Sequence, residues 1–196
     1  DFALESYRRA QEAIATGTFK QEIVPVAVPQ RKGGVVTVTE DEEPNRVDLS
    51  KLRELKPVFQ DDGVLTVGNS PSCNDGAAAL VVMAEEEAAH LGLTPMGRIV
   101  SYAGAALAPE WFTLAPIDAI RRVLKQTGLT LDDIELFEIN EAFSAVSLAI
   151  NRELGLDATR VNVNGGAVAL GHPIGATGAR ILTTLLYAME ARDVRR

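Results

Sequence analysis

The sequence predicts a layered α/β fold, and three features of residues 97–196 support this prediction. Short apolar segments alternate with helical patterns in the order βαβαβα. The apolar segments are nearly continuous, as in parallel sheets that are covered on both faces. Pro116 begins one helical pattern and Gly128 follows its end, while Gly155 follows the next pattern, which is the usual asymmetry of helix ends. Together these features predict helices packed on a mainly parallel sheet.

The first third of the chain has its own pattern of elements. Ala3, Tyr7 and Ala10 recur at helical spacing, and Gly17 follows as a stop signal. Two β-rich runs come next, separated by two glycines and flanked by prolines that suit an edge strand. We expect this part to be an elaboration and not a core. The predicted elements are a helix over Phe2–Thr16, strands over Ile23–Val28 and Val35–Thr39, and a short helix between Ser50 and Pro57.

The rest of the chain is assigned from periodicity and end signals. The run Ala77–Met83 is apolar and short, so it fits either a buried strand or a buried helical turn. A short helix over Glu85–Leu91 follows it, and places His90 at the surface. The remaining predicted strands are Arg98–Ala103, Ile134–Ile139 and Arg160–Val163, and the remaining helices are Pro116–Thr127, Glu141–Leu154 and Gly175–Ala191.

Composition excludes several functional classes. The chain has 196 residues, a net charge of −8 and no basic stripe, so we expect no nucleic-acid partner. No apolar run approaches the roughly 20 residues of a membrane span, so we expect no membrane insertion, and the first residues indicate an amphipathic helix, not a signal peptide. Cys73 is the only cysteine, which excludes an internal disulfide and fits a reducing compartment, so we expect the cytoplasm. We expect no metal and no permanently bound cofactor.

The segment 161–180 contains five glycines and His172 between a predicted strand and a long helix. Such glycine density indicates close backbone approach or positive φ angles. A phosphate-binding turn is one interpretation, but the spacing matches neither the dinucleotide fingerprint nor a P-loop. Pro173 favours an extended backbone at His172, and the following glycines leave room for its ring. A core histidine is the alternative, and the glycines favour a functional role.

Two further segments carry polar side chains at predicted turns. Asn140 and Glu141 stand where a strand meets a helix, which is where ligands contact α/β sheets, although Asn140 could also cap the helix. The loop 68–76 is rich in turn residues and contains Cys73. A nucleophilic pair of Cys73 with His90 is conceivable, but no adjacent base supports it.

The sequences GN-x-x-x-x-NDGAA at 68–78, NEAF at 140–143 and NVNGGAVALGHPIGATGAR at 162–180 together resemble the thiolase family, in that order and at similar separations. The resemblance covers the chain as a C-terminal half. It implies a thiolase-like α/β/α fold with an incomplete C-terminal core and part of the loop domain. The implied division is 1–67 for part of the loop domain, 68–96 for the last elements of the N-terminal core, and 97–196 for a C-terminal domain without its last strands.

The resemblance also implies roles for individual residues. His172 matches the histidine that donates to the thioester oxygen, and Asn140 matches the residue that holds a water at that oxygen. The two thiolase cysteines have no counterpart, because Cys73 matches neither position. Pro71 stands where many thiolases have a serine that contacts pantetheine. The other matches are Ala142, Phe143, Phe59, Val67 and Phe112 along the pantetheine channel, and Arg46 near the CoA nucleotide.

The resemblance therefore implies an acetyl-CoA C-acyltransferase fragment, inactive alone, with acyl-CoA and acetyl-CoA as substrates. The segment Trp111–Ala115 differs from the usual family stretch beside the acyl pocket, which could change the acyl-chain preference. A non-catalytic acyl-CoA-binding or assembly module is the alternative, and a dinucleotide oxidoreductase ranks last. Because a partial sheet leaves unpaired edges, we expect a homo-oligomer in which another copy covers them.

Overall fold

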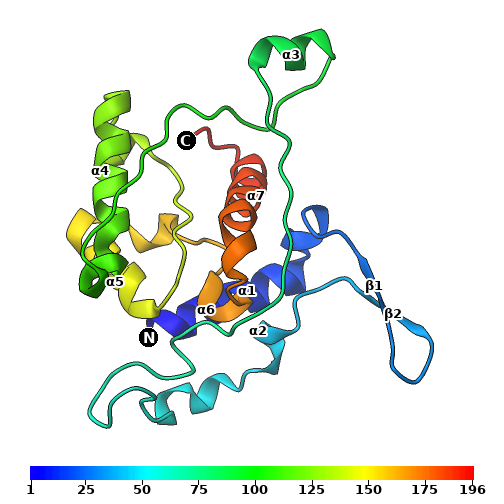
Figure 1. Cartoon of the computed structure of the whole chain (residues 1–196), viewed down its shortest axis with the longest axis vertical. Coiled ribbons are helices and arrows are strands. Elements are labelled where there is room, and N and C mark those ends of the chain that lie inside the picture. The colour runs from blue at the N-terminus through cyan, green and yellow to red at the C-terminus, as the bar shows by residue number, and fades with distance from the viewer.

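The computed structural model describes all 196 residues, as seven α-helices and one two-stranded sheet (Figure 1). Short 3₁₀ turns connect several of these elements. No helix combines the length and the apolar character that crossing a membrane requires. The helices are α1 (Phe2–Thr16), α2 (Glu43–Arg46), α3 (Glu85–His90), α4 (Ala115–Thr127), α5 (Ser144–Leu154), α6 (Ala167–Leu170) and α7 (Ile174–Arg192), and the strands are β1 (Val26–Pro29) and β2 (Val35–Val38).

Helix α1 begins and ends where the sequence predicts. Gly17 stops it in the left-handed conformation, with φ 75°, and its N–H reaches the carbonyl of Ile14 at 3.0 Å. The apolar face of α1 packs on α6, and Tyr7 and Ala10 are buried in that contact. The expectation that the first third is only an elaboration is therefore wrong, because α1 supplies three of the five residues of one hydrophobic cluster. Ala3, Tyr7, Ala10, Val168 and Ala169 form this cluster.

The second cluster joins α4 and α5 to the extended segments beside them. Helix α4 begins within one residue of its predicted start and ends where predicted, and α7 lies within one residue of its predicted bounds at both ends. Ile150 of α5 is fully buried between α4 and the segments around Ile139 and Val161. The core of this cluster consists of Ile117, Ile139, Val146, Ile150, Leu156 and Val161.

The predicted parallel sheet is reduced to one short pairing. Phe137 and Val161 form a parallel bridge, and the N–H of Phe137 donates to Arg160 O at 2.9 Å. The predicted strand Arg98–Ala103 is extended but unpaired, and Ala77–Met83 forms neither a strand nor a helix. Val81 is 87% exposed and Val100 is 68% exposed, so the rest of the chain does not cover these two side chains. An apolar run becomes a strand only where a second backbone accepts its hydrogen bonds.

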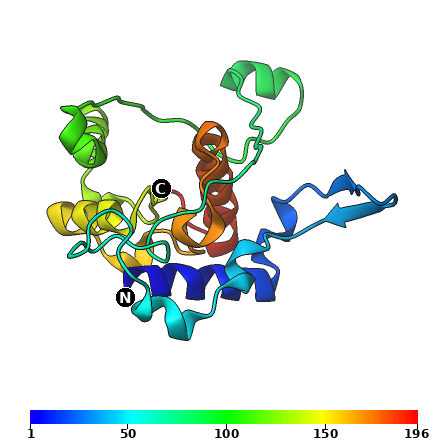
Figure 2. The ribbon, with the colours of Figure 1, turned by 60° about the horizontal axis from the view of Figure 1, so that its bottom comes forward.

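The hairpin β1–β2 is the only regular sheet. It is antiparallel, with Val26 opposite Val38 and Pro29 opposite Val35. Strand β1 begins three residues later than predicted, directly after Pro25, which has no N–H for a ladder. The hairpin projects from the body of the chain, and α3 stands out separately on its own loop (Figure 2). His90, at the end of α3, is exposed as predicted.

Candidate active site

The end of the 137–139 segment is held by one asparagine side chain. Asn162 has φ 45°, an angle that asparagine tolerates better than most residues. Its Oδ1 accepts from the N–H of Ile139 at 2.8 Å, and its Nδ2 donates to Ile139 O at 2.8 Å. The side chain thus replaces the next residues of a neighbouring strand. It fixes the backbone immediately before Asn140.

Glu141 turns inward and is 1% exposed. Its carboxylate accepts from Ser6 Oγ at 2.7 Å, from Asn162 Nδ2 at 3.0 Å and from the N–H of Val168 at 3.0 Å. Burial raises the pKa of Glu141, and these hydrogen bonds oppose the shift. Helix α5 consequently begins at Ser144 and not at the predicted Glu141.

Asn140 does not cap α5. The N-cap position belongs to Phe143, and no side chain bonds to the first turn of the helix. The capping interpretation of Asn140 is therefore wrong. Its amide is instead free to face the histidine loop.

The glycines before His172 permit close contacts, as the sequence indicates. A Cβ on Gly166 would lie 2.3 Å from Glu141 Cδ, and one on Gly171, which has φ 90°, would lie 2.1 Å from Asn74 Oδ1. Gly175 and Gly178 have no atoms within 4 Å of an added Cβ. Close approach therefore explains the first glycines of the loop and not the last two.

His172 is fixed on both ring nitrogens. Nδ1 lies 2.8 Å from Thr177 Oγ1, whose own hydrogen is donated to Pro173 O at 2.9 Å. Because the hydroxyl hydrogen is already used, Nδ1 must carry the proton and donate to Thr177. In the neutral ring Nε2 then has a lone pair, and it lies 3.4 Å from Asn140 Nδ2. The two predicted catalytic side chains are thus in contact.

The electrostatic surroundings favour a neutral imidazole. Burial lowers the pKa of His172 from its ordinary 6.5, and the positive charge of Arg180 lowers it further. Asn140 Oδ1 is buried and accepts no hydrogen bond from the protein. Near pH 7 the site therefore presents one basic ring nitrogen beside one amide.

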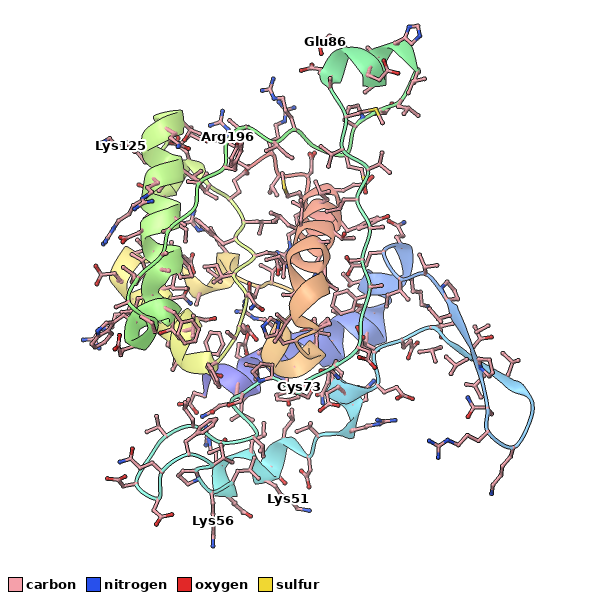
Figure 3. All side chains as sticks on the ribbon, viewed as in Figure 1. Lys51, Lys56, Cys73, Glu86, Lys125 and Arg196 are labelled. Carbon is pink, nitrogen blue, oxygen red and sulfur yellow. The ribbon has the colours of Figure 1, made fainter.

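The loop 68–76 lies along the same site. The N–H of His172 donates to Ser72 O at 3.0 Å, and the N–H of Ser144 donates to Asn69 O at 3.0 Å. Cys73 lies in this loop with an exposed thiol. Figure 3 places Cys73 near the start of α7, whereas α3, marked by Glu86, lies at the far end of the molecule. A nucleophilic pair of Cys73 with His90 is therefore not formed.

Some of the predicted channel residues come together and others do not. Phe59 and Phe143 meet edge to face, with ring centroids 6.5 Å apart. Phe112 and Ala142 line a pocket of about 300 Å³ together with Asn140. Val67 is exposed, and Pro71 is half-buried next to Ser72. Arg46 is exposed on α2, where its guanidinium donates to Glu42 at 2.6 Å.

The sequence analysis missed the side chains that orient this site. Thr177 sets the protonated nitrogen of His172, and Asn162 and Glu141 set the backbone around Asn140. The glycine spacing gave one usable signal, since Gly166 must lie against another group. Nothing in the spacing identifies Thr177, because it looks like any polar residue in the first turn of a helix.

Known proteins of one family resemble this chain. The chain matches the family profiles "Thiolase, N-terminal domain" over residues 1–86 and "Thiolase, C-terminal domain" over residues 93–196. It is 56% identical over 190 residues to an acetyl-CoA acetyltransferase of Yarrowia lipolytica, covering 97% of this chain and 48% of that protein. It is 50% identical to an acetyl-CoA acetyltransferase of Pseudomonas aeruginosa, covering 100% of this chain and 50% of that protein.

Solved structures show the same likeness. The acetyl-CoA acetyltransferase of Bacillus anthracis matches with a TM-score of 0.94 and 44% identity, over 98% of this chain and 49% of that one. Human mitochondrial 3-ketoacyl-CoA thiolase matches with a TM-score of 0.89 and 38% identity, again over 98% and 49%.

The fold is therefore the thiolase-like α/β fold that the sequence predicts. The chain belongs to the thiolase family, and the relatives at 50% and 56% identity are acetyl-CoA acetyltransferases. It spans about half the length of the curated relatives that it matches.

Proposed function

We propose that this chain supplies the oxyanion-binding half of an acetyl-CoA C-acyltransferase site and does not turn over alone. The supporting observation is the contact of Asn140 Nδ2 with His172 Nε2 at 3.4 Å, with the opposite ring nitrogen fixed on Thr177. This arrangement suits an acyl transfer in which negative charge develops on a thioester oxygen.

The unprotonated Nε2 defines the order of proton movements. His172 first takes the proton of a thiol, which leaves a thiolate nucleophile and an imidazolium. The thiolate attacks the thioester carbon, the C=O π electrons move to oxygen, and Nε2–H donates to that oxyanion. Asn140 Nδ2 supplies a second donor, directly or through a water. Each preorganised donor contributes about 3 to 4 kcal/mol to the transition state.

The thiol that His172 serves is proposed to come from outside this chain. Cys73 is the only cysteine and its thiol is exposed, and the resemblance implies that it matches neither thiolase cysteine. The edge-to-face pair Phe59–Phe143 and the pocket beside Phe112 and Ala142 would then form part of the wall for pantetheine and a short acyl group. We propose that Arg46 contacts the CoA nucleotide, and that Val67 and Pro71 border the channel.

The activity assay is thiolysis of acetoacetyl-CoA, followed by loss of the substrate's absorbance. The chain alone should show no turnover, and mixing with the complementary half of the Pseudomonas aeruginosa relative should restore it. The restored activity should be lost with His172→Ala, while His90→Ala serves as the matched control. Turnover by the chain alone that Cys73→Ala abolishes would contradict the proposal.

A non-catalytic acyl-CoA-binding module is the second candidate, because the aromatic pair is formed within this chain. Calorimetric titration with CoA addresses it. Binding that Phe143→Ala weakens and the exposed-surface control Tyr102→Ala leaves unchanged, without turnover in the mixture, would favour this module over the enzyme half.

Organisation and location complete the proposal. We propose 1–67 as part of a loop domain, 68–96 as the last elements of an N-terminal core and 97–196 as a C-terminal core. The exposed extended segments around Val81 and Val100 support assembly into a homo-oligomer through the thiolase core. The free thiol of Cys73 fits a cytoplasmic location.

A further inference from the structure

Arg180 lies on α7, three residues beyond Thr177, so the two side chains lie on neighbouring turns of one helix face. Its side chain is 22% exposed, and Nη1 lies 3.9 Å from Glu138 Oε2. The side chain of Glu138 is 3% exposed and stands two residues before Asn140. Arg180 therefore contacts the extended segment that carries Asn140, while its own helix carries the partner of His172.

These contacts form a closed ring. Asn140 meets His172 at 3.4 Å, and His172 meets Thr177 at 2.8 Å. One helical turn leads from Thr177 to Arg180, the contact of Arg180 Nη1 with Glu138 Oε2 at 3.9 Å leads to Glu138, and two residues lead back to Asn140. Movement of α7 along the 138–140 segment would disturb both contacts of the imidazole ring.

We propose that Arg180 is a positioning residue that keeps His172 in its neutral form with the proton on Nδ1. Its contact with Glu138 holds α7 against the 138–140 segment, and its positive charge disfavours a second proton on the imidazole. The inference rests on the proposed function and deepens it, because it concerns the protonation state of His172, which acts as the base in that function. Arg180 itself touches neither His172 nor Asn140 in any hydrogen bond.

The charges around Arg180 explain why its field reaches the imidazole. Burial raises the pKa of Glu138 to about 8, so this carboxyl is mostly protonated at neutral pH. Burial likewise raises the pKa of Glu22 to about 7 and that of Glu141, and partial enclosure raises the pKa of Asp41. In each case Arg180 opposes the increase. Glu138 is mostly protonated and Glu22 partly protonated near pH 7, so these two carboxyls leave the guanidinium charge incompletely neutralised. The repulsion from this charge disfavours an imidazolium at His172.

The test uses the 196-residue chain labelled with ¹⁵N at histidine, because its two histidines give two separate signals. Exposed His90 is the internal reference. The ring ¹⁵N shifts report both the pKa and the protonated nitrogen, and no CoA or turnover is needed. A failed activity assay therefore leaves this measurement intact.

In the unsubstituted chain, His172 should titrate below the ordinary histidine value of 6.5 and show the Nδ1–H form. Arg180→Met should move the His172 titration upward and mix the two tautomers. Arg180→Lys, which keeps the charge, should retain most of the downward displacement, and Arg121→Met on the exposed face of α4 should change nothing. Equal effects of the Met and Lys variants, or no effect of the Met variant, would overturn the proposal.

A second arm uses Glu138→Gln, which has nearly the same shape as the protonated acid. The neutral imidazole of His172 does not itself titrate near pH 8. A change in its ring ¹⁵N shifts near that pH would therefore report ionisation of Glu138, transmitted by Arg180. The unsubstituted chain should show this inflection and the Gln variant should lack it. An unsubstituted chain without the inflection, or with His172 titrating at or above 6.5, also overturns the proposal.

Discussion

Glu141→Gln is the sharpest test of how the junction around Asn140 is held. Three donors converge on the two oxygens of this carboxylate: Ser6 and Val168 on Oε2, and Asn162 on Oε1. Glutamine keeps the size of the side chain but replaces one acceptor with an NH₂ group. Asn162 cannot turn its amide to compensate, because both ends are bound to Ile139.

The magnitude follows from the less costly orientation of the glutamine. Placing its NH₂ at the Oε1 position loses one hydrogen bond to a charged acceptor, worth about 1.5 to 3 kcal/mol, and leaves one buried N–H unsatisfied. Removing a buried charge offsets part of this loss. We expect the free energy of unfolding to fall by about 2 kcal/mol, which lowers the urea midpoint by about 1 M for an m-value near 2 kcal/mol/M.

The assay is urea unfolding at pH 7, followed by circular dichroism. The matched control is Glu153→Gln on the exposed face of α5, which should change the free energy of unfolding by less than about 0.5 kcal/mol. If Glu141→Gln is as stable as the unsubstituted chain, the carboxyl is held protonated and the ionised, three-donor arrangement is refuted.

Three further predictions concern the same region. The unfolded Glu138 carboxyl ionises near pH 4.5 and the folded one near 8, so its contribution to stability is present below pH 4.5 and is lost as the pH rises to 8. Urea unfolding at several pH values should show this decline, and Glu138→Gln should flatten it; an equal slope in both chains contradicts the assignment. Gly166→Ala should destabilise the chain, since its Cβ would lie 2.3 Å from a buried carboxyl carbon, whereas Gly178→Ala, in open space on α7, should stabilise it by about 0.5 to 1 kcal/mol; thermal melts that rank the two variants the other way would reject this interpretation. Thr177→Val removes the acceptor of Nδ1–H, so ring ¹⁵N shifts should show a mixture of tautomers at His172; an unchanged tautomer would mean that another group fixes the ring.

The helices could be predicted because their end signals are local. Gly17, Gly128 and Gly155 each end a helix in the left-handed conformation, where a glycine avoids the clash that a Cβ would cause. The start of α5 could not be predicted in the same way. Glu141 is drawn out of the helix by contacts with residues far from it in sequence, and helical periodicity contains no information about them.

The sheet could not be predicted from apolar runs for a related reason. Hydrophobicity identifies a segment that would be buried in a sheet, but pairing depends on a second backbone at the right place. The backbone of Phe137 pairs with that of Arg160 and Val161, whereas no other strand pairs with the apolar run around Val100. The same pattern thus gave one correct pairing and one unpaired strand.

The sequence predicted which two side chains meet at the candidate site, but not how they are oriented. The motifs identify His172 and Asn140, and the structure brings them together. Which ring nitrogen is basic depends on Thr177, whose hydroxyl donates to Pro173 O and can therefore only accept from Nδ1. A tautomer is a property of hydrogen-bond geometry, and no sequence spacing encodes it.

The geometry of the Asn140–His172 pair and the lack of pairing in the extended segments have different physical origins. Every contact that fixes the Asn140–His172 pair lies within this chain, from Ser6 on α1 through Asn162 to Thr177 on α7. Polar contacts of this kind are short and directional, so they can set the geometry of the pair without a completed sheet. The extended segments depend instead on backbone partners that the chain does not provide. We therefore expect the orientation of His172 to be less sensitive to the proposed thiol-bearing partner than the pairing of residues 77–83 and 98–103 is. Hydrogen exchange of the chain alone and of its mixture with that partner would compare the two directly.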